Sequence, residues 1–226
     1  MKISLLKNTK KNLHFIHIGK TGGSNIKSTL KDINLRKYKL IFHPHEVNLS
    51  DIPEGDKVFF CIRNPIDRFQ SGFYSRKRKG QPRYYSEWSD SERISFNTFS
   101  SAEELASSLD ENMDHYEEAK FAMNSITHIN SSYWDWFKSE EYFNKRLSGM
   151  FFILRLENFN EDFNNLLLKL DIKKKIKLGS DKISMHSNNV KYSLSKESLV
   201  NLNIWYKNEN RFIDFINKKI NFINNK

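Results

Sequence analysis

The residues that could do chemistry gather in the first third of the chain, beginning with HFIHIGKTGGSN at residues 14–25. An apolar run is followed here by a turn with Gly22 and Gly23, and then by apolar residues at helical spacing. Glycines let a backbone turn tightly and approach a ligand, and the N–H groups that open a helix bind anions. Lys20 adds a positive charge. The segment predicts a phosphate or sulfate site, with a plain strand-to-helix turn as the alternative.

The same turn lacks the spacing of a triphosphate-binding loop. A Walker A motif places its lysine after the last glycine, whereas Lys20 precedes the glycine pair. The short turn also leaves little room for a triphosphate chain. An ordinary ATPase or kinase is therefore disfavoured, and a nucleotide or small-molecule kinase with a degenerate phosphate loop stays as a second hypothesis.

A second candidate anion site follows the apolar run KVFFCI at residues 57–62. Arg63 stands at the carboxyl end of this expected strand, where ligands of open α/β sheets bind. Ser71 follows on the next expected helix, and a guanidinium with a hydroxyl suits a phosphate. Arg68 is expected to brace the loop through Asp67 or another carboxylate. Alternatively, Arg63 is a structural residue in a helix-capping salt bridge.

Two histidines occur in FHPHEV, residues 42–47, after another expected strand. The carboxyl ends of parallel strands meet at one edge of a sheet, so we expect His43 and His45 near Lys20. An imidazole titrates near neutral pH and suits the removal of a proton from a hydroxyl. A metal site lacks an evident third ligand, and a purely structural role for both rings is the other alternative.

These groups need a parallel sheet to bring them together. Strand-like and helix-like segments alternate through the first third, which predicts a three-layer α/β fold of the P-loop-NTPase-like type, a parallel sheet flanked by helices with helical insertions. Expected strands are residues 13–18, 39–42, 57–62 and 151–155. Expected helices are residues 25–33, 113–126, 133–147 and 161–170, one from Pro65, one after the Ser101–Glu104 capping box, and a long final one capped by Ser195. Residues 79–100 are expected to form a long surface loop.

Length and composition bound these readings. A chain of 226 residues predicts a single domain spanning residues 1–226. The 37 Lys and Arg exceed the 27 Asp and Glu, a net charge of +10, so anionic ligands are expected and a non-catalytic basic module for glycans or nucleic acid is a third hypothesis. No nucleic-acid fold signature is present. The lone Cys61 and the absence of a membrane-spanning run or a signal peptide predict a cytoplasmic protein.

Both anion motifs, in this order and separation, resemble those of the carbohydrate sulfotransferases that use 3′-phosphoadenosine-5′-phosphosulfate. The chain is most similar to the heparan sulfate 2-O- and 6-O-sulfotransferases and to bacterial sulfotransferase family 2 proteins. The resemblance rests on residues 14–30 and 58–78, and continues weakly through residues 152–163 and the final helix. One departure is Gly19, where that family usually has proline before the lysine.

The resemblance implies a sulfotransferase that moves a sulfuryl group from this donor to a hydroxyl, expected on a carbohydrate, and leaves the 3′,5′-bisphosphate without needing a metal. Lys20 would contact the oxygen that bridges sulfate and 5′-phosphate, and Arg63 and Ser71 would bind the 3′-phosphate. His45 would be the base, assisted by His43, and Glu46 is a rival base. The 5′-phosphate would be cradled by Thr21, Gly22, Gly23, Ser24 and Asn25.

Further contacts are expected with the donor and the acceptor. Relatives place a basic loop against the 3′-phosphate where this chain has Asn188 and Lys191, with a solvated loop as the alternative. Aromatic faces stack on sugar rings and arginines suit acidic polysaccharides. Candidate acceptor-binding residues are Tyr74, Arg78, Tyr84 and Trp134. A charged, solvated loop is the alternative for the stretch that holds the first three of these residues, and Trp134 is a core residue by default.

Overall fold

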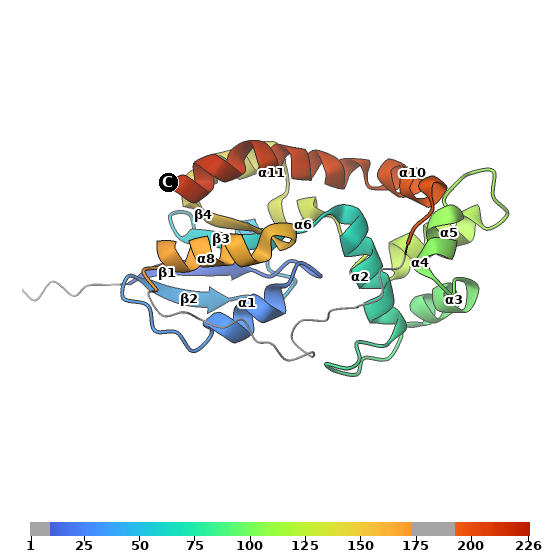
Figure 1. Cartoon of the computed structure of the whole chain (residues 1–226), viewed down its shortest axis with the longest axis horizontal. Helices are drawn as coiled ribbons and strands as arrows, with labels where there is room; N and C mark the ends of the chain where they lie inside the picture. Colours follow the sequence, from blue (N-terminus) through green and yellow to red (C-terminus); the bar gives the residue numbers. More distant parts are fainter. Residues whose placement is uncertain (1–9, 173–192) are drawn as a thin grey trace, which may run out of the picture.

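The computed structural model describes residues 10–172 and 193–226, and within them four strands form one parallel sheet (Figure 1). The strands are β1 (Lys11–Ile16), β2 (Tyr38–Phe42), β3 (Lys57–Ile62) and β4 (Met150–Arg155). Their order is β2-β1-β3-β4, and every neighbouring pair is parallel. β3 and β4 are nearly continuous apolar runs because both faces of a sheet covered by helices are buried. The predicted α/β class with a parallel sheet is confirmed.

Helices cover both faces of this sheet and make three layers. On one face α1 (Gly23–Leu30) and α8 (Phe159–Lys169) pack against Phe15 and Phe59. On the other face α11 (Lys207–Asn225) packs through Phe212 against Phe60 and its neighbours. Figure 1 shows α11 and α1 on opposite sides of the sheet. Alternate strand residues therefore point into two separate cores.

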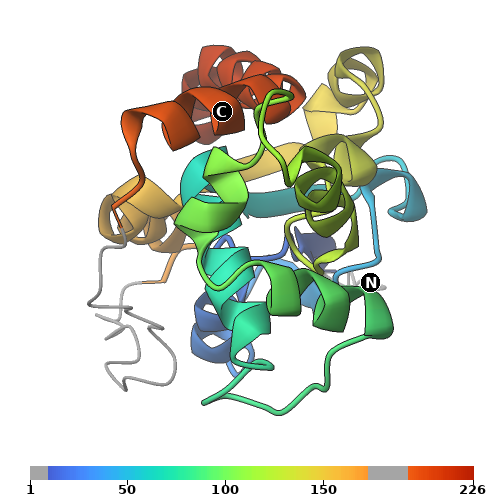
Figure 2. The same ribbon diagram turned by 90° about the vertical axis from the view of Figure 1, so that its right-hand side faces the viewer.

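A helical region adjoins the sheet and has a core of its own (Figure 2). It contains α2 (Pro65–Lys77), α3 (Asp90–Thr98), α4 (Ala102–Ser107), α5 (Tyr116–Ser125) and α10 (Lys196–Trp205). Two short helices, α6 (Tyr133–Phe137) and α7 (Glu140–Lys145), lead from this region back to β4. The 3₁₀ turns of the described residues are Leu49–Asp51, Leu147–Gly149 and Leu156–Asn158. The predicted helical insertions are thus confirmed, and α2 joins the two regions because it starts at the end of β3.

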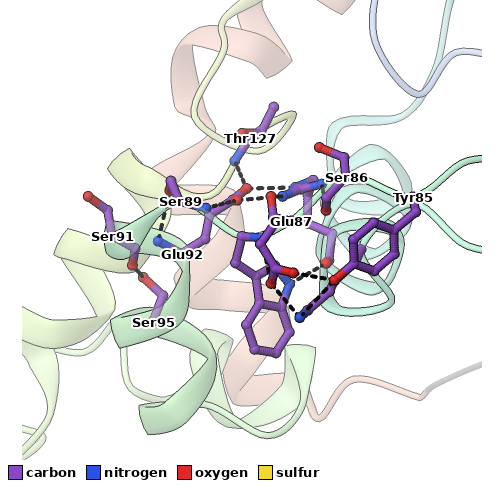
Figure 3. Close-up of polar contacts among 11 residues, drawn as sticks. Tyr85, Ser86, Glu87, Ser89, Ser91, Glu92, Ser95 and Thr127 are labelled. Carbon is purple, nitrogen blue, oxygen red and sulfur yellow. Dashed lines mark hydrogen bonds and ion pairs between the residues drawn. The ribbon is translucent and has the colours of Figure 1, made fainter.

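A buried ion pair ties the helical region together (Figure 3). Arg76 of α2 donates from Nε and Nη2 to Glu92 of α3, at 2.7 and 2.5 Å. Glu92 also accepts from the backbone N–H groups of Ser89 and Thr127. These hydrogen bonds satisfy a carboxylate that is only 1 % exposed, as a buried charge requires.

The structure corrects three expectations about secondary structure. Residues 79–100 contain α3 rather than only a loop, because Ser89 and Glu92 form a capping box and Phe96 is buried. The single helix predicted over residues 133–147 is two, since Lys138 adopts φ 64° and ends α6. The predicted long final helix is also two.

The division of the final helix falls at Tyr206, which ends α10 and precedes α11. Its buried hydroxyl donates to the carbonyl of Ile129 at 3.3 Å. Ser195 caps α10 as predicted, accepting from the N–H of Ser198 at 3.0 Å. Among residues 10–172 and 193–226, no helix combines the length and apolar character needed to cross a bilayer.

Candidate active site

The turn after β1 presents the start of α1 to the carboxyl edge of the sheet. Gly22 adopts φ 83°, in the left-handed region that favours glycine, and α1 begins at the next residue. A Cβ on Gly23 would lie 2.2 Å from the His17 ring, so no side chain fits there. The first amides of a helix have no partner within it, and they can hold an anion. Ser24 and Asn25 are half-buried at this helix start.

Thr21 holds the turn together from inside. Its side chain is fully buried, and its hydroxyl donates to the carbonyl of Ile18 at 3.0 Å. The preceding residue, Lys20, has a φ of 67°, a backbone conformation that residues other than glycine rarely adopt. Such backbone conformations concentrate at functional sites, where surrounding contacts maintain them. Among the predicted residues of this turn, Thr21 is therefore an internal brace, whereas Ser24 and Asn25 stay partly exposed.

The two predicted anion motifs meet at one place. Arg63 follows β3, and its guanidinium Nη1 donates to the carbonyl of Lys20 at 3.3 Å. Burial, together with the nearby charges of Arg63, Arg78 and Arg83, lowers the pKa of Lys20 to about 8. Burial is the largest cause of this shift, and the three arginine charges add to it, so several cations lie near one another in a partly desolvated place. The cluster is arranged to receive an anion that carries more than one charge.

Arg68 braces the turn, but its acceptors differ from the prediction. It donates from Nε to the carbonyl of Gly19 at 3.1 Å and from Nη1 to the carbonyl of Ser131 at 2.8 Å. The expected bridge to Asp67 or another carboxylate is wrong, because backbone carbonyls take these hydrogen bonds. The buried guanidinium also lies over the rings of Tyr133 and Trp136.

Helix α6 supports the site at two further points. The fully buried hydroxyl of Tyr133 accepts from the Arg63 N–H at 3.0 Å and donates to the Arg63 carbonyl at 2.7 Å. The indole N–H of Trp136 donates to the carbonyl of His45 at 2.8 Å. The aromatic segment at residues 133–137 thus fixes the backbones of both Arg63 and His45.

His45 lies beside the turn in a defined tautomer. Its Nδ1 is 2.7 Å from the carbonyl of His17, and a carbonyl can only accept, so Nδ1 carries the proton. In the neutral ring, Nε2 is therefore the unprotonated nitrogen, which is the form a general base requires. The predicted His45 thus lies next to the anion-binding turn, whereas the rival Glu46 is exposed to solvent.

Two further histidines, His17 and His128, lie close to His45. The His17 ring centroid lies 4.0 Å from that of His45, and the His128 centroid lies at 5.8 Å. Burial is the main cause that lowers the pKa of each to about 3, helped by His45 at both and by Lys20 at His128. Both rings are neutral at physiological pH.

A sequence signal existed for only one of these two. His17 stands at the end of the first strand, three residues before Lys20, which is a ligand-binding position in such sheets. His128 reaches the site from a distant loop, where its Nδ1 would be 3.0 Å from a Cβ on Gly19. Within the described residues, no group of three or more His, Cys, Asp or Glu could hold a metal ion.

His43 has its polar contacts away from His45. Its Nε2 lies 2.8 Å from Nδ1 of His14, and Nε2 of His14 lies 3.1 Å from a carboxylate oxygen of Asp56. The stacked rings of His14 and His43 have centroids 5.1 Å apart. The structure therefore connects the predicted assistant of the base to a separate polar chain.

The remaining predicted residues have varied environments. Ser71 is half-buried on α2, and Arg78 is exposed at the end of that helix but close enough to affect Lys20. Tyr84 is 48 % exposed. Trp134 is half-buried against Phe212 of α11, as a core residue would be.

Tyr74 lies inside the core of the helical region. It is 8 % exposed, and its hydroxyl accepts from the Ala102 N–H at 3.4 Å. The structure contradicts an acceptor-binding role for Tyr74, because its ring packs inside that core. Asn188 and Lys191 lie outside the residues that the structure describes.

Comparison with known proteins identifies the family. Searches of curated proteins and of solved structures each found no match. The profile of one protein family, described as the Sulfotransferase family, matches residues 4–212. This range includes both anion motifs, the histidines beside them and the whole parallel sheet. The chain belongs to the Sulfotransferase family and is a sulfotransferase, an enzyme that transfers sulfuryl groups.

Proposed function

We propose that the protein transfers a sulfuryl group from 3′-phosphoadenosine-5′-phosphosulfate to a hydroxyl of a carbohydrate. The observation that carries this proposal is the convergence of Lys20 and Arg63, with Arg78 and Arg83 nearby. Burial first, and then these three charges, lower the pKa of Lys20 to about 8. Cations that repel one another cost folding free energy, and an anionic ligand removes that cost. A nucleotide with phosphates at two positions fits two adjacent cationic motifs.

The residues present fit such a donor. The N–H groups at the start of α1, with Ser24 and Asn25, would hold the 5′-phosphate. Gly22 and Gly23 leave room for the side chains of Leu156 and His17, which a Cβ would press on. Thr21 would act mainly by closing the turn, since its hydroxyl proton goes to Ile18.

Arg63 would bind the 3′-phosphate together with Ser71, and Asn188 and Lys191 are further candidates for it. Arg63 is suited to this role because Tyr133 holds its backbone on both sides, so the guanidinium starts from a fixed point. Preference for a 3′-phosphorylated nucleotide over ATP would rest on Arg63 and Ser71. Membership of a sulfotransferase family also favours sulfuryl over phosphoryl transfer.

When bound, the donor supplies a sulfuryl group attached to a phosphate that can leave. The unprotonated Nε2 of His45 would take the hydroxyl proton as the acceptor oxygen bonds to sulfur. Lys20 would meet the negative charge that grows as the bond from sulfur to the phosphate oxygen breaks. The products are a sulfate ester, the 3′,5′-bisphosphate and a proton on His45. Lys20 and the turn amides would provide the neutralisation, so no metal is needed in this scheme.

The proposed acceptor rests on the surface beside the cation cluster. Tyr84 and Tyr85 are exposed on the same loop as Arg83, and aromatic faces with arginines suit sugars that carry acidic groups. Trp134 is a weaker candidate because it packs on α11. We propose a cytoplasmic location on the basis of the lone cysteine, which is buried.

The test is to incubate the protein with the donor and a panel of neutral and acidic glycans and to measure release of the 3′,5′-bisphosphate. Release that depends on one acceptor class supports the proposal, and Lys20→Ala should abolish it. Lys31→Ala is the matched control, because Lys31 is an exposed lysine at the far end of α1.

Nucleotide binding separates the proposed function from its alternatives. Calorimetry should show that the bisphosphate binds more tightly than ATP, and that Arg63→Ala removes this preference. A kinase would prefer ATP. A non-catalytic basic module would bind glycans with steep salt dependence and without preference among nucleotides. Either of those results would contradict the proposal.

A further inference from the structure

A polar chain of three side chains lies beside the candidate active site and has no part in the reaction scheme above. It runs from Asp56, just before β3, through His14 on β1, to His43 after β2. His14 is 5 % exposed, which is unusual for a strand residue that carries two polar nitrogens. Both of its nitrogens have partners within the chain, so the three groups form one hydrogen-bonded unit.

The direction of each hydrogen bond follows from the acceptor at the end of the chain. The Asp56 carboxylate accepts from the amide of Asn12 at 3.1 Å and faces Nε2 of His14 at 3.1 Å. Hydrogen bonds from Asn12 and His14 lower the pKa of Asp56, so it is ionised at neutral pH and accepts from His14 Nε2–H. When His14 is neutral, its Nδ1 is bare and accepts from Nε2–H of His43.

His43 is coupled to His45 by a short and stiff piece of backbone. Only Pro44 separates them, and the proline ring restricts φ at that position. The His43 N–H also donates to the carbonyl of Phe15 at 3.3 Å, which fastens this segment to β1. A displacement of the His43 ring therefore moves the backbone that carries His45.

The His45 side has its own contacts, and they fix a different part of the segment. Its Nδ1–H donates to His17, and its carbonyl accepts from Trp136. The tripeptide at residues 43–45 is thus held at both ends, by the Asp56–His14–His43 chain and by the contacts of His45. Loss of one anchor leaves the other to hold the ring with less precision.

We propose that His14 and Asp56 are positioning residues for the reaction, acting through His43 to hold the segment that presents His45 to the acceptor hydroxyl. This inference rests on the proposed role of His45 as the base. It gives His43 a positioning role, because Nε2 of His43 faces His14. Displacements of about 1 Å at a reacting group reduce rates by up to about 100-fold. We therefore expect loss of these positioning contacts to lower kcat.

Two substitutions of His14 separate its two hydrogen bonds. An asparagine oxygen can stand in for Nδ1, so His14→Asn keeps an acceptor for His43 and loses the bond to Asp56. A glutamine amide can stand in for Nε2, so His14→Gln keeps the bond to Asp56 and loses His43. We expect kcat to fall about tenfold in His14→Gln and less than about threefold in His14→Asn, with donor KM unchanged in both.

The control variant is His115→Gln, which makes the same change at an exposed histidine before α5 and should leave kcat unchanged. Melting temperatures of all variants show how much of each effect is lost folding. Equal kcat in His14→Gln and His14→Asn, or losses of kcat that follow the melting temperatures, would contradict a positioning role.

Nitrogen NMR of the histidine rings tests the same inference without turnover. The native protein should show His43 and His14 protonated at Nε2 and His45 protonated at Nδ1. In His14→Gln, we expect the His45 Nδ1–H signal to weaken or exchange faster as the segment loosens. An unchanged His45 signal would overturn the proposal. If the native protein shows the expected protonation pattern but releases no bisphosphate, the proposed function fails while the positioning contacts stand.

Discussion

The sheet edge and the helical region make different contributions to the site. The sheet edge supplies the groups that would face ligands, Lys20, His45 and Arg63, each from a segment directly after a strand. The helical region and α6 supply Arg68 and Tyr133, which hold the backbones of those segments. The comparison teaches that a parallel sheet brings reactive groups near one another, whereas their orientation depends on side chains from elsewhere in the chain.

The two regions also treat charge differently. In the helical region, Arg76 and Glu92 form a buried pair, and each charge is satisfied within the protein. At the sheet edge, Lys20 lies among other cations, and its pKa is lowered to about 8. Loss of one partner of a buried ion pair destabilises a fold, whereas an anionic ligand relieves cations that repel one another. Five experiments can sharpen or break this contrast.

The largest effect is expected at Lys20. Lys20→Met should reduce kcat/KM by about 1,000-fold, because it removes a cation placed to meet charge on the leaving group. The same change should raise the free energy of unfolding at pH 7 by on the order of 1 kcal/mol, since it removes a charge that is buried and repelled by neighbouring arginines. Turnover assays and chemical denaturation measure both. A less stable Lys20→Met protein would break the contrast.

The next largest effect is expected at His45. His45→Asn keeps a donor for the carbonyl of His17 but removes the proton acceptor, so kcat should fall by about 100-fold or more. Affinity for the bisphosphate, measured by calorimetry, should stay within about twofold. Normal turnover would move the base elsewhere, and Glu46→Gln would then be the variant to assay.

A pH profile tests the lowered pKa of Lys20. Below about pH 8 its ammonium is charged and can bind an anion, and above this value the charge is lost. We therefore expect kcat/KM for the donor to fall about tenfold per pH unit above pH 8, since this ratio reports groups of the free enzyme. Lys20→Arg, which stays protonated, should flatten the alkaline limb whatever its absolute rate. A limb that persists unchanged in Lys20→Arg would assign it to another group.

A smaller effect is expected from Tyr133. Tyr133→Phe removes the hydroxyl that binds the N–H and carbonyl of Arg63, so the bisphosphate should bind about tenfold more weakly. Tyr206→Phe is the matched control, because its buried hydroxyl donates to Ile129 and not to the site. Equal losses of affinity in both variants would mean that the effect is one of general stability.

The smallest effect on turnover is expected at Glu92. Burial opposes ionisation of this carboxyl, but hydrogen bonds from Arg76 and from backbone N–H groups lower its pKa to about 2. Glu92→Gln should cost about 3 kcal/mol of unfolding free energy, because Arg76 loses its partner, while kcat per folded molecule changes little.

The pH dependence of stability provides a check on Glu92. A pKa lowered in the folded protein means that its contribution is complete above the ordinary value of 4.5. The contribution declines as the pH falls from there towards 2. Acid unfolding of the native protein should therefore be steeper in this interval than that of Glu92→Gln. Identical acid profiles would place the stabilising charge elsewhere.

Much of the fold and part of the site could be predicted from the sequence. A continuous apolar run such as KVFFCI is typical of a strand buried on both faces, so the sequence predicted the parallel sheet. Once the sheet is parallel, groups after its strands must share an edge, which placed Lys20 near Arg63. The sequence also predicted the turn, because glycine readily adopts a positive φ such as the 83° of Gly22, which other residues rarely adopt.

Other features of the site and fold could not be predicted from the sequence, because they depend on contacts between distant residues. His128 joins the site from a separate loop, and Tyr74, which looked available for an acceptor, is enclosed by the core of the helical region. The break at Lys138 and the helix within residues 79–100 escaped prediction, because caps and tertiary burial override simple periodicity.

The sequence by itself determined the class of fold, the two anion motifs and the histidine beside them, because local spacing and strand order set these features. Only the tertiary structure decided which nitrogen of His45 is free, what holds Arg63, and that His43 turns towards His14. The physical reason is that hydrogen-bond direction and burial are properties of pairs of groups. Those pairs form only when segments far apart in the chain pack together.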